Sequence, residues 1–167
     1  MSEPFVAIVM GSDSDLPVME ASFEILRTFG VAFEARITSA HRTPEVTKAY
    51  VADAEARGCE VFIAAAGMAA HLAGAVSAAT VKPVIGVPMN ASLDGLDALL
   101  STVQMPAGIP VATVAIGKAG AKNAAYLATQ ILSVRDPQLA VKLRQERAAN
   151  AEAIAAKDAA LQEKLKG

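Results

Sequence analysis

Short apolar runs rich in β-branched residues alternate with longer helical segments along most of this 167-residue chain. Each apolar run has the length of a buried strand, and each is followed by a segment with helical periodicity. The pattern predicts strands at residues 5–10, 31–38, 61–65, 84–87 and 111–116. It predicts helices at residues 15–29, 44–57, 71–80, 96–103 and 119–134, and a long helical tail over 137–166. Such alternation is typical of a parallel sheet that is covered by helices on both faces.

The expected fold is therefore α/β: a three-layer sandwich with a central five-stranded parallel sheet, flavodoxin-like, plus a long C-terminal helix. The Asp136-Pro137 step divides the chain into an α/β domain at residues 1–134 and a helical extension at residues 135–167. Ligands of open parallel sheets bind beyond the carboxyl ends of the strands. Glycine- and serine-rich segments follow the first four strands, so they should gather at one rim of the sheet.

The composition of the chain limits the kinds of partner that the protein is expected to bind. Fifteen Lys and Arg residues against seventeen Asp and Glu give a net charge of −2, which offers no support for binding nucleic acid or an anionic membrane. The uncharged stretches 61–81 and 98–117 are interrupted by glycine, proline and histidine, so no membrane-spanning helix is expected. A single cysteine, Cys59, excludes an internal disulfide framework, and a cytoplasmic location is expected. The helix at 71–80 has no charged face, which favours a tight homo-oligomer.

The chain has two histidines, and each lies in a segment with possible chemistry. His41 is followed by Arg42 and by a proline-started helix, which places a proton carrier beside a guanidinium group suited to phosphate. His71 follows Gly67 in a loop of small residues, where the backbone can approach a ligand closely. The alternative interpretation makes His41 a surface residue, Arg42 a partner of Glu45 and His71 a helix cap. Thirty positions separate the histidines, so metal binding is not expected.

Two further kinds of segment follow predicted strands. Residues 10–17 place Ser12, Ser14 and Asp15 before a helix, where they can cap its N-terminus or hold a phosphate. Ordinary capping needs only one such side chain, so a ligand is the preferred interpretation. The proline-containing segments 88–95 and 103–110 could cover a site as lids, although such segments usually serve only to direct the chain.

Five motifs together resemble one family, the class I 5-(carboxyamino)imidazole ribonucleotide mutases of purine biosynthesis. They are Gly-Ser-Asp-Ser-Asp at 11–15, Ser-Ala-His-Arg-Thr-Pro at 39–44, Ala-Gly-Met-Ala-Ala-His-Leu-Ala-Gly at 66–74, Pro-Val-Ile-Gly-Val-Pro at 83–88 and Gln-Met-Pro-Ala-Gly-Ile-Pro-Val-Ala-Thr at 104–113. Family members often have Gly-Gly-Ala-Ala-His-Leu-Pro-Gly in the third motif, where this chain has Met68 and Ala73. The Ala-Ala-His-Leu run favours the mutase over the animal-type carboxylase, which uses free carbon dioxide.

The resemblance implies an isomerase that moves a carboxylate from the exocyclic nitrogen of an aminoimidazole ribonucleotide to ring carbon 4, without cofactor or metal. It implies that His41 is the catalytic proton carrier, that Arg42 binds the phosphate, and that the pocket loop confines carbon dioxide. Substrate-binding residues implied with them are Ser12, Ser14, Asp15, Ser39, Gly67, Ala70, His71 and Leu72. Similar enzymes are octamers whose C-terminal helix packs on neighbouring subunits.

The sequence leaves three other hypotheses about function open. A carboxylase that uses free carbon dioxide on aminoimidazole ribonucleotide would have nearly the same site. A noncatalytic nucleotide-binding module would explain Ser12, Asp15 and Arg42 but would give His41 no task. A purely structural oligomer would not need the polar segments at the rim of the sheet.

Overall fold

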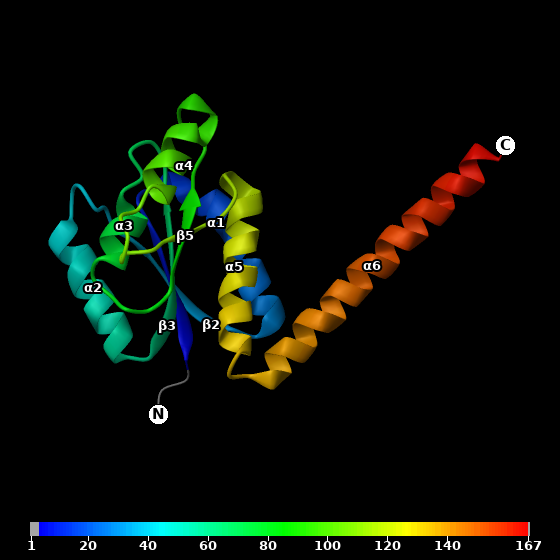
Figure 1. Cartoon of the computed structure of the whole chain (residues 1–167), viewed down its shortest axis with the longest axis horizontal. Coiled ribbons are helices and arrows are strands. Elements are labelled where there is room, and N and C mark those ends of the chain that lie inside the picture. Colours follow the sequence, from blue (N-terminus) through cyan, green and yellow to red (C-terminus); the bar gives the residue numbers. More distant parts are fainter. Residues whose placement is uncertain (1–3, 167) are drawn as a thin grey trace.

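The computed structural model describes residues 4–166, and a five-stranded sheet runs through the middle of the molecule (Figure 1). The strands are β1 (Phe5–Met10), β2 (Ala32–Ile37), β3 (Cys59–Ala66), β4 (Val84–Pro88) and β5 (Ala112–Thr113). They lie in the order β2-β1-β3-β4-β5, and every neighbouring pair is parallel. The predicted fold class is confirmed.

Helices cover both faces of the sheet, as three layers require. Helices α1 (Leu16–Phe29) and α5 (Gly117–Ser133) pack together on one face. Helices α2 (Pro44–Ala56), α3 (Leu72–Ser77) and α4 (Leu96–Val103) lie on the other (Figure 1). Each face of the sheet has its own hydrophobic core, and successive side chains of β1 point into different cores. Ile8 packs in the core under α1 and α5, whereas Val9 packs in the core under α2 and α3. Both faces of β1 are buried, which explains its uninterrupted apolar sequence.

The fifth strand is much shorter than predicted. The apolar run 111–116 predicts six strand residues, but only Ala112 and Thr113 pair with β4, opposite Ile85 and Gly86. Within the described residues, β5 is the edge strand of the sheet and pairs with β4 alone. Gly117 then begins α5 with a φ of 71°. The apolar residues of this run therefore serve packing at the sheet edge rather than strand pairing.

The last helix, α6 (Pro137–Leu165), leaves the body of the molecule as a long straight rod (Figure 1). Asp136 caps its N-terminus by accepting hydrogen bonds from the N–H groups of Gln138 and Leu139. Leu139 and Leu143 are buried against the body, whereas residues 147–166 are all exposed. The final five turns of α6 thus gain nothing from packing within this chain. Among the described residues, no helix is long and apolar enough to cross a bilayer.

Candidate active site

A cavity of about 410 Å³ lies at the carboxyl ends of the strands. It is formed by the segments that follow β1, β2 and β3, with one residue contributed from beyond β4. The lining residues are Gly11, Ser12, Ser14, Asp15, Ser39, Ala40, His41, Arg42, Ala66, Gly67, Met68, Ala69, His71, Leu72 and Ala91. The expected gathering of the polar segments at one rim is therefore confirmed.

The two histidines meet at this cavity. Nε2 of His41 lies 2.7 Å from Nδ1 of His71, and the rings approach edge to face with centroids 4.9 Å apart. A hydrogen bond between two imidazole nitrogens needs one donor and one acceptor. The contact therefore holds a single proton, and it would be lost if both rings were protonated. The contact couples the protonation of one imidazole ring to that of the other.

Local hydrogen bonds fix the loop that carries His41. The backbone N–H of Arg42 donates to Oγ of Ser39 at 3.1 Å, and the N–H of Ser39 donates to Oγ1 of Thr43 at 3.0 Å. Pro44 then begins α2, where its missing N–H costs the helix nothing. These bonds close the loop on itself, so His41 projects from a constrained backbone. Ser39 has a positioning role here in addition to lining the cavity.

Ser12, Ser14 and Asp15 form a compact cluster that also lines the cavity. Oγ of Ser14 donates to Oγ of Ser12 at 2.9 Å, and the N–H of Ser12 donates to the Asp15 carboxylate at 3.2 Å. Ser12 and Asp15 together form a capping box on the short 3-10 helix at Asp13–Asp15. Burial raises the pKa of the Asp15 carboxyl, the bond from Ser12 opposes this rise, and the Asp13 charge adds to it. The capping interpretation is thus correct for Ser12, while the cluster still faces the cavity.

Arg42 is the only Lys or Arg among the described residues that line the cavity. The alternative pairing with Glu45 is not among the ion pairs formed within residues 4–166. Its exposed guanidinium group therefore offers its N–H donors at the mouth of the cavity. This arrangement suits an anionic group such as a phosphate.

The loop after β3 supplies the apolar wall. A side chain at Gly67 would meet the Cβ of Ala91 at 3.1 Å, so the close approach of these two segments requires a very small residue there. Leu72 lines the cavity from a buried position. Ala70, which the resemblance also implies, is 1% exposed and is not one of the lining residues. Its side chain is buried away from the cavity instead.

The two candidate lids differ in position. Ala91, in the segment 88–95, reaches the cavity. The segment 103–110 packs along α3 instead: Oγ of Ser77 donates to the carbonyl of Pro110 at 2.7 Å, and Met105 lies over Gly74. Within this chain, residues 103–110 do not line the cavity. The remaining lining residues lie within the quoted motifs but were not among the predicted site residues; they are Gly11, Ala40, Ala66, Met68 and Ala69.

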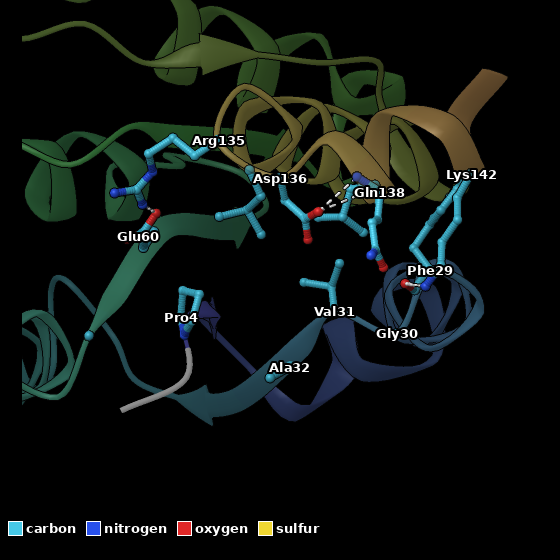
Figure 2. Close-up of a pocket in the computed structure, with 13 residues that line it drawn as sticks. Pro4, Phe29, Gly30, Val31, Ala32, Glu60, Arg135, Asp136, Gln138 and Lys142 are labelled. Carbon is cyan, nitrogen blue, oxygen red and sulfur yellow. Dashed lines mark hydrogen bonds and ion pairs between the residues drawn. The ribbon is translucent and has the colours of Figure 1, made fainter. Parts of the chain in front are cut away.

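A larger cavity, of about 580 Å³, lies at the other end of the sheet, where α6 joins the body (Figure 2). Its charged groups are already engaged: Arg135 pairs with Glu60, and Nζ of Lys142 donates to the carbonyl of Phe29 at 2.9 Å. It contains neither histidine. Across residues 4–166, no three His, Cys, Asp or Glu side chains gather as a metal site would need. The smaller cavity, which holds both histidines and Arg42, is therefore the candidate active site.

Comparison with known proteins shows the family of the chain. The family model described as AIR carboxylase matches residues 5–165. The chain belongs to the AIR carboxylase family.

Relatives of this AIR carboxylase family member include enzymes with two different names. This chain is 59% identical over 143 residues to N5-carboxyaminoimidazole ribonucleotide mutase of Pyrococcus horikoshii. The aligned residues make up 85% of this chain and 80% of that protein. The chain is 54% identical to phosphoribosylaminoimidazole carboxylase of Saccharomyces cerevisiae, over 87% of this chain and 25% of the yeast protein. The crystal structure of Treponema denticola PurE superposes with a TM-score of 0.85 at 34% identity, covering 94% of this chain and 98% of that one.

Proposed function

We infer that this chain is a 5-(carboxyamino)imidazole ribonucleotide mutase, which converts the N-carboxylated nucleotide into 5-amino-4-carboxyimidazole ribonucleotide during purine biosynthesis. The observation that carries the proposal is the 2.7 Å contact between His41 and His71 on a cavity that also presents Arg42. The relative from Pyrococcus horikoshii, 59% identical, bears the same enzyme name and supports the assignment.

The proposed reaction moves one carboxylate in one direction and one proton in the other. The carbamate N–C bond breaks as the exocyclic nitrogen receives a proton from the imidazolium of His41, and neutral carbon dioxide is released. Ring carbon 4 uses its enamine electrons to form a bond to this carbon dioxide. The now neutral His41 then removes the proton left on carbon 4, which restores the aromatic ring and the starting imidazolium. Positioned proton transfer of this kind contributes about 10²–10⁴-fold to a rate.

The remaining residues have separate tasks in this proposal. His71 accepts or donates the hydrogen bond at Nε2 of His41 and so orients that ring between its two proton transfers. Arg42 and the Ser12 cluster, which includes Ser14 and Asp15, bind the phosphate and ribose. Binding at the phosphate is remote from the reacting carbon, so its free energy can serve orientation. The wall of the cavity around the substrate is formed in part by Ser39, Gly67 and Leu72.

The direct test is an isomerisation assay with the carbamate nucleotide in the absence of ATP and added metal. The wild-type chain should form the 4-carboxylated product. His41→Asn keeps a polar side chain but carries no titratable proton, so turnover should fall by about 10²–10⁴-fold while nucleotide binding persists. Near-normal turnover in this variant would contradict the role assigned to His41.

A second candidate is aminoimidazole ribonucleotide carboxylase, which takes up free carbon dioxide directly. The 54% identity to the yeast phosphoribosylaminoimidazole carboxylase supports this second candidate. Initial rates with the carbamate substrate, compared with aminoimidazole ribonucleotide plus bicarbonate, separate the two enzymes. A noncatalytic nucleotide binder would catalyse neither reaction, and it would not exchange the carbon 4 proton of aminoimidazole ribonucleotide with deuterated solvent.

The exposed end of α6 supports a proposal about assembly. Ile154, Leu161 and Leu165 are between 51% and 71% exposed, although an apolar side chain is stabilised by leaving water. We propose that α6, as the C-terminal extension, packs on neighbouring subunits of a cytoplasmic homo-oligomer, and that this oligomer is an octamer, as the family resemblance implies. Light scattering of the full chain measures the assembly, and a monomer at micromolar concentration would exclude it.

A further inference from the structure

Met68 has an unusual backbone conformation in the wall of the cavity. Its φ is 57°, in the left-handed region that glycine enters freely and that crowds the Cβ of other residues. The carbonyl of Met68 accepts the N–H of Ala70 at 2.9 Å, and the next N–H along, that of His71, bonds to Ala69 at 2.8 Å. The tight turn toward His71 thus holds Met68 in this conformation. Strained residues of this kind concentrate at functional sites.

Packing within the chain does not account for a long side chain here. Met68 is 59% exposed, so it does not fill the core. Its neighbours Gly67 and Ala69 have no side chain long enough to reach across the cavity. Leu72 is the other large apolar residue that lines the cavity, and it is buried and fixed. Among the described lining residues, Met68 is therefore the one long apolar side chain with room to move.

The proposed reaction creates a need for such a side chain. After the N–C bond breaks and before the C–C bond forms, carbon dioxide carries no charge. Arg42 and the Ser12 cluster therefore offer it no ionic attraction. It stays near ring carbon 4 only if apolar groups close the space around it. Methionine is unbranched and has a polarizable thioether, so it adapts its shape to fill irregular gaps.

We propose that Met68 closes the apolar side of the occupied cavity and sets the fraction of carbon dioxide that is recaptured rather than lost. This inference rests on the proposed mutase function. Escape leaves aminoimidazole ribonucleotide, with the nitrogen protonated and the N–C bond already broken. Recapture adds the C–C bond and removes the carbon 4 proton. Met68 would determine the ratio of these two products without taking part in proton transfer.

The experiment follows a carbamate substrate labelled with ¹³C in its carboxyl group, using the full-length enzyme and unlabelled bicarbonate buffer. The ratio of released aminoimidazole ribonucleotide to labelled 4-carboxylated product is measured after subtraction of the uncatalysed loss of carbon dioxide. Met68→Ala removes the side chain, Met68→Gly also relieves the backbone, and Met68→Leu keeps the bulk. Val134→Ala, at an 85% exposed position directly after the last residue of α5, is the matched control.

The Ala and Gly variants should raise this ratio by at least about fourfold, the factor that corresponds to one methylene-sized apolar contact. The Leu and control variants should stay near wild type. Met68→Gly should also melt roughly 2–4 °C above Met68→Ala, because only alanine retains the strained φ.

An unchanged ratio in both the Ala and Gly variants would overturn the proposal, as would loss of turnover in them without release of aminoimidazole ribonucleotide. A wild-type enzyme that forms no 4-carboxylated product would instead refute the underlying mutase assignment. The two failures are therefore distinguishable in one assay.

Discussion

Gly86 lies in the middle of β4, where α4 and the segment entering β5 pack against the strand. A Cβ added to Gly86 would lie 2.8 Å from Cγ1 of Val111 and closer still to Cγ2 of Thr102. Thr102 is 2% exposed, and its hydroxyl donates to the carbonyl of Ala98 at 2.7 Å. The threonine therefore cannot turn away without losing a buried hydrogen bond. Glycine at position 86 is what allows α4 to approach β4.

The expected cost of Gly86→Ala follows from this geometry. Overpacking a dense core by one methyl group costs about 1–3 kcal/mol. The lower entropy of an unfolded chain with alanine offsets about 0.4–1 kcal/mol of this. A net loss of about 1–2 kcal/mol should lower the melting temperature by roughly 2–8 °C in a chain of this size.

Thermal and urea denaturation should be followed by circular dichroism at a fixed protein concentration, because association itself stabilises a protein. Thr102→Ser removes the clashing methyl group and keeps the hydroxyl. Gly86→Ala and Thr102→Ser together should therefore show a favourable interaction free energy of about 1 kcal/mol. Gly11→Ala is the control, since its added Cβ would meet no atom closer than 3.7 Å. A fully stable Gly86→Ala, or a double variant whose effects simply add, would refute this account.

The other predictions concern the site. Arg42→Ala should raise the KM for the phosphorylated substrate by about tenfold or more while kcat changes little, because a charge-assisted contact to phosphate is lost. Steady-state kinetics measures both constants. An unchanged KM would exclude the contact between Arg42 and the phosphate. Burial raises the pKa of Asp15 above its ordinary 3.8. The native state then binds more protons than the unfolded state between the unfolded-state pKa and the higher folded pKa, so stability falls as pH rises through that window. Asp15→Asn should therefore gain stability over wild type between pH 3 and pH 7 in melting experiments, whereas a constant difference would contradict the burial argument.

Much of the fold could be predicted from local patterns. The helix at Leu96–Val103 was predicted to the residue, and Pro44 and Gly30 mark helix ends that the structure confirms. These signals act within one or two turns of chain, where capping and side-chain periodicity operate. The length of β5 was wrong because pairing at a sheet edge depends on the neighbouring strand, which sits far away in sequence.

The site was predicted only in part, for a related reason. Parallel strands bring their carboxyl ends to one edge, so the approach of Ser12 and His41 could be expected. The direct contact of His41 with His71, across thirty residues, could not. Nor could the position of Ala91 against Gly67, or the path of residues 104–110 along α3. Each of these depends on how close two separate segments come, which no local pattern records.

The sequence by itself determined the alternation of strands and helices, the caps and the residue types available for proton transfer, because these follow from interactions between near neighbours in the chain. The tertiary structure decided which of those residues meet. The order β2-β1-β3 sets the His41 loop and the His71 loop on either side of the segment after β1. Their 2.7 Å contact, and the strained turn at Met68 beside it, exist only because the packed sheet fixes these backbones at that separation.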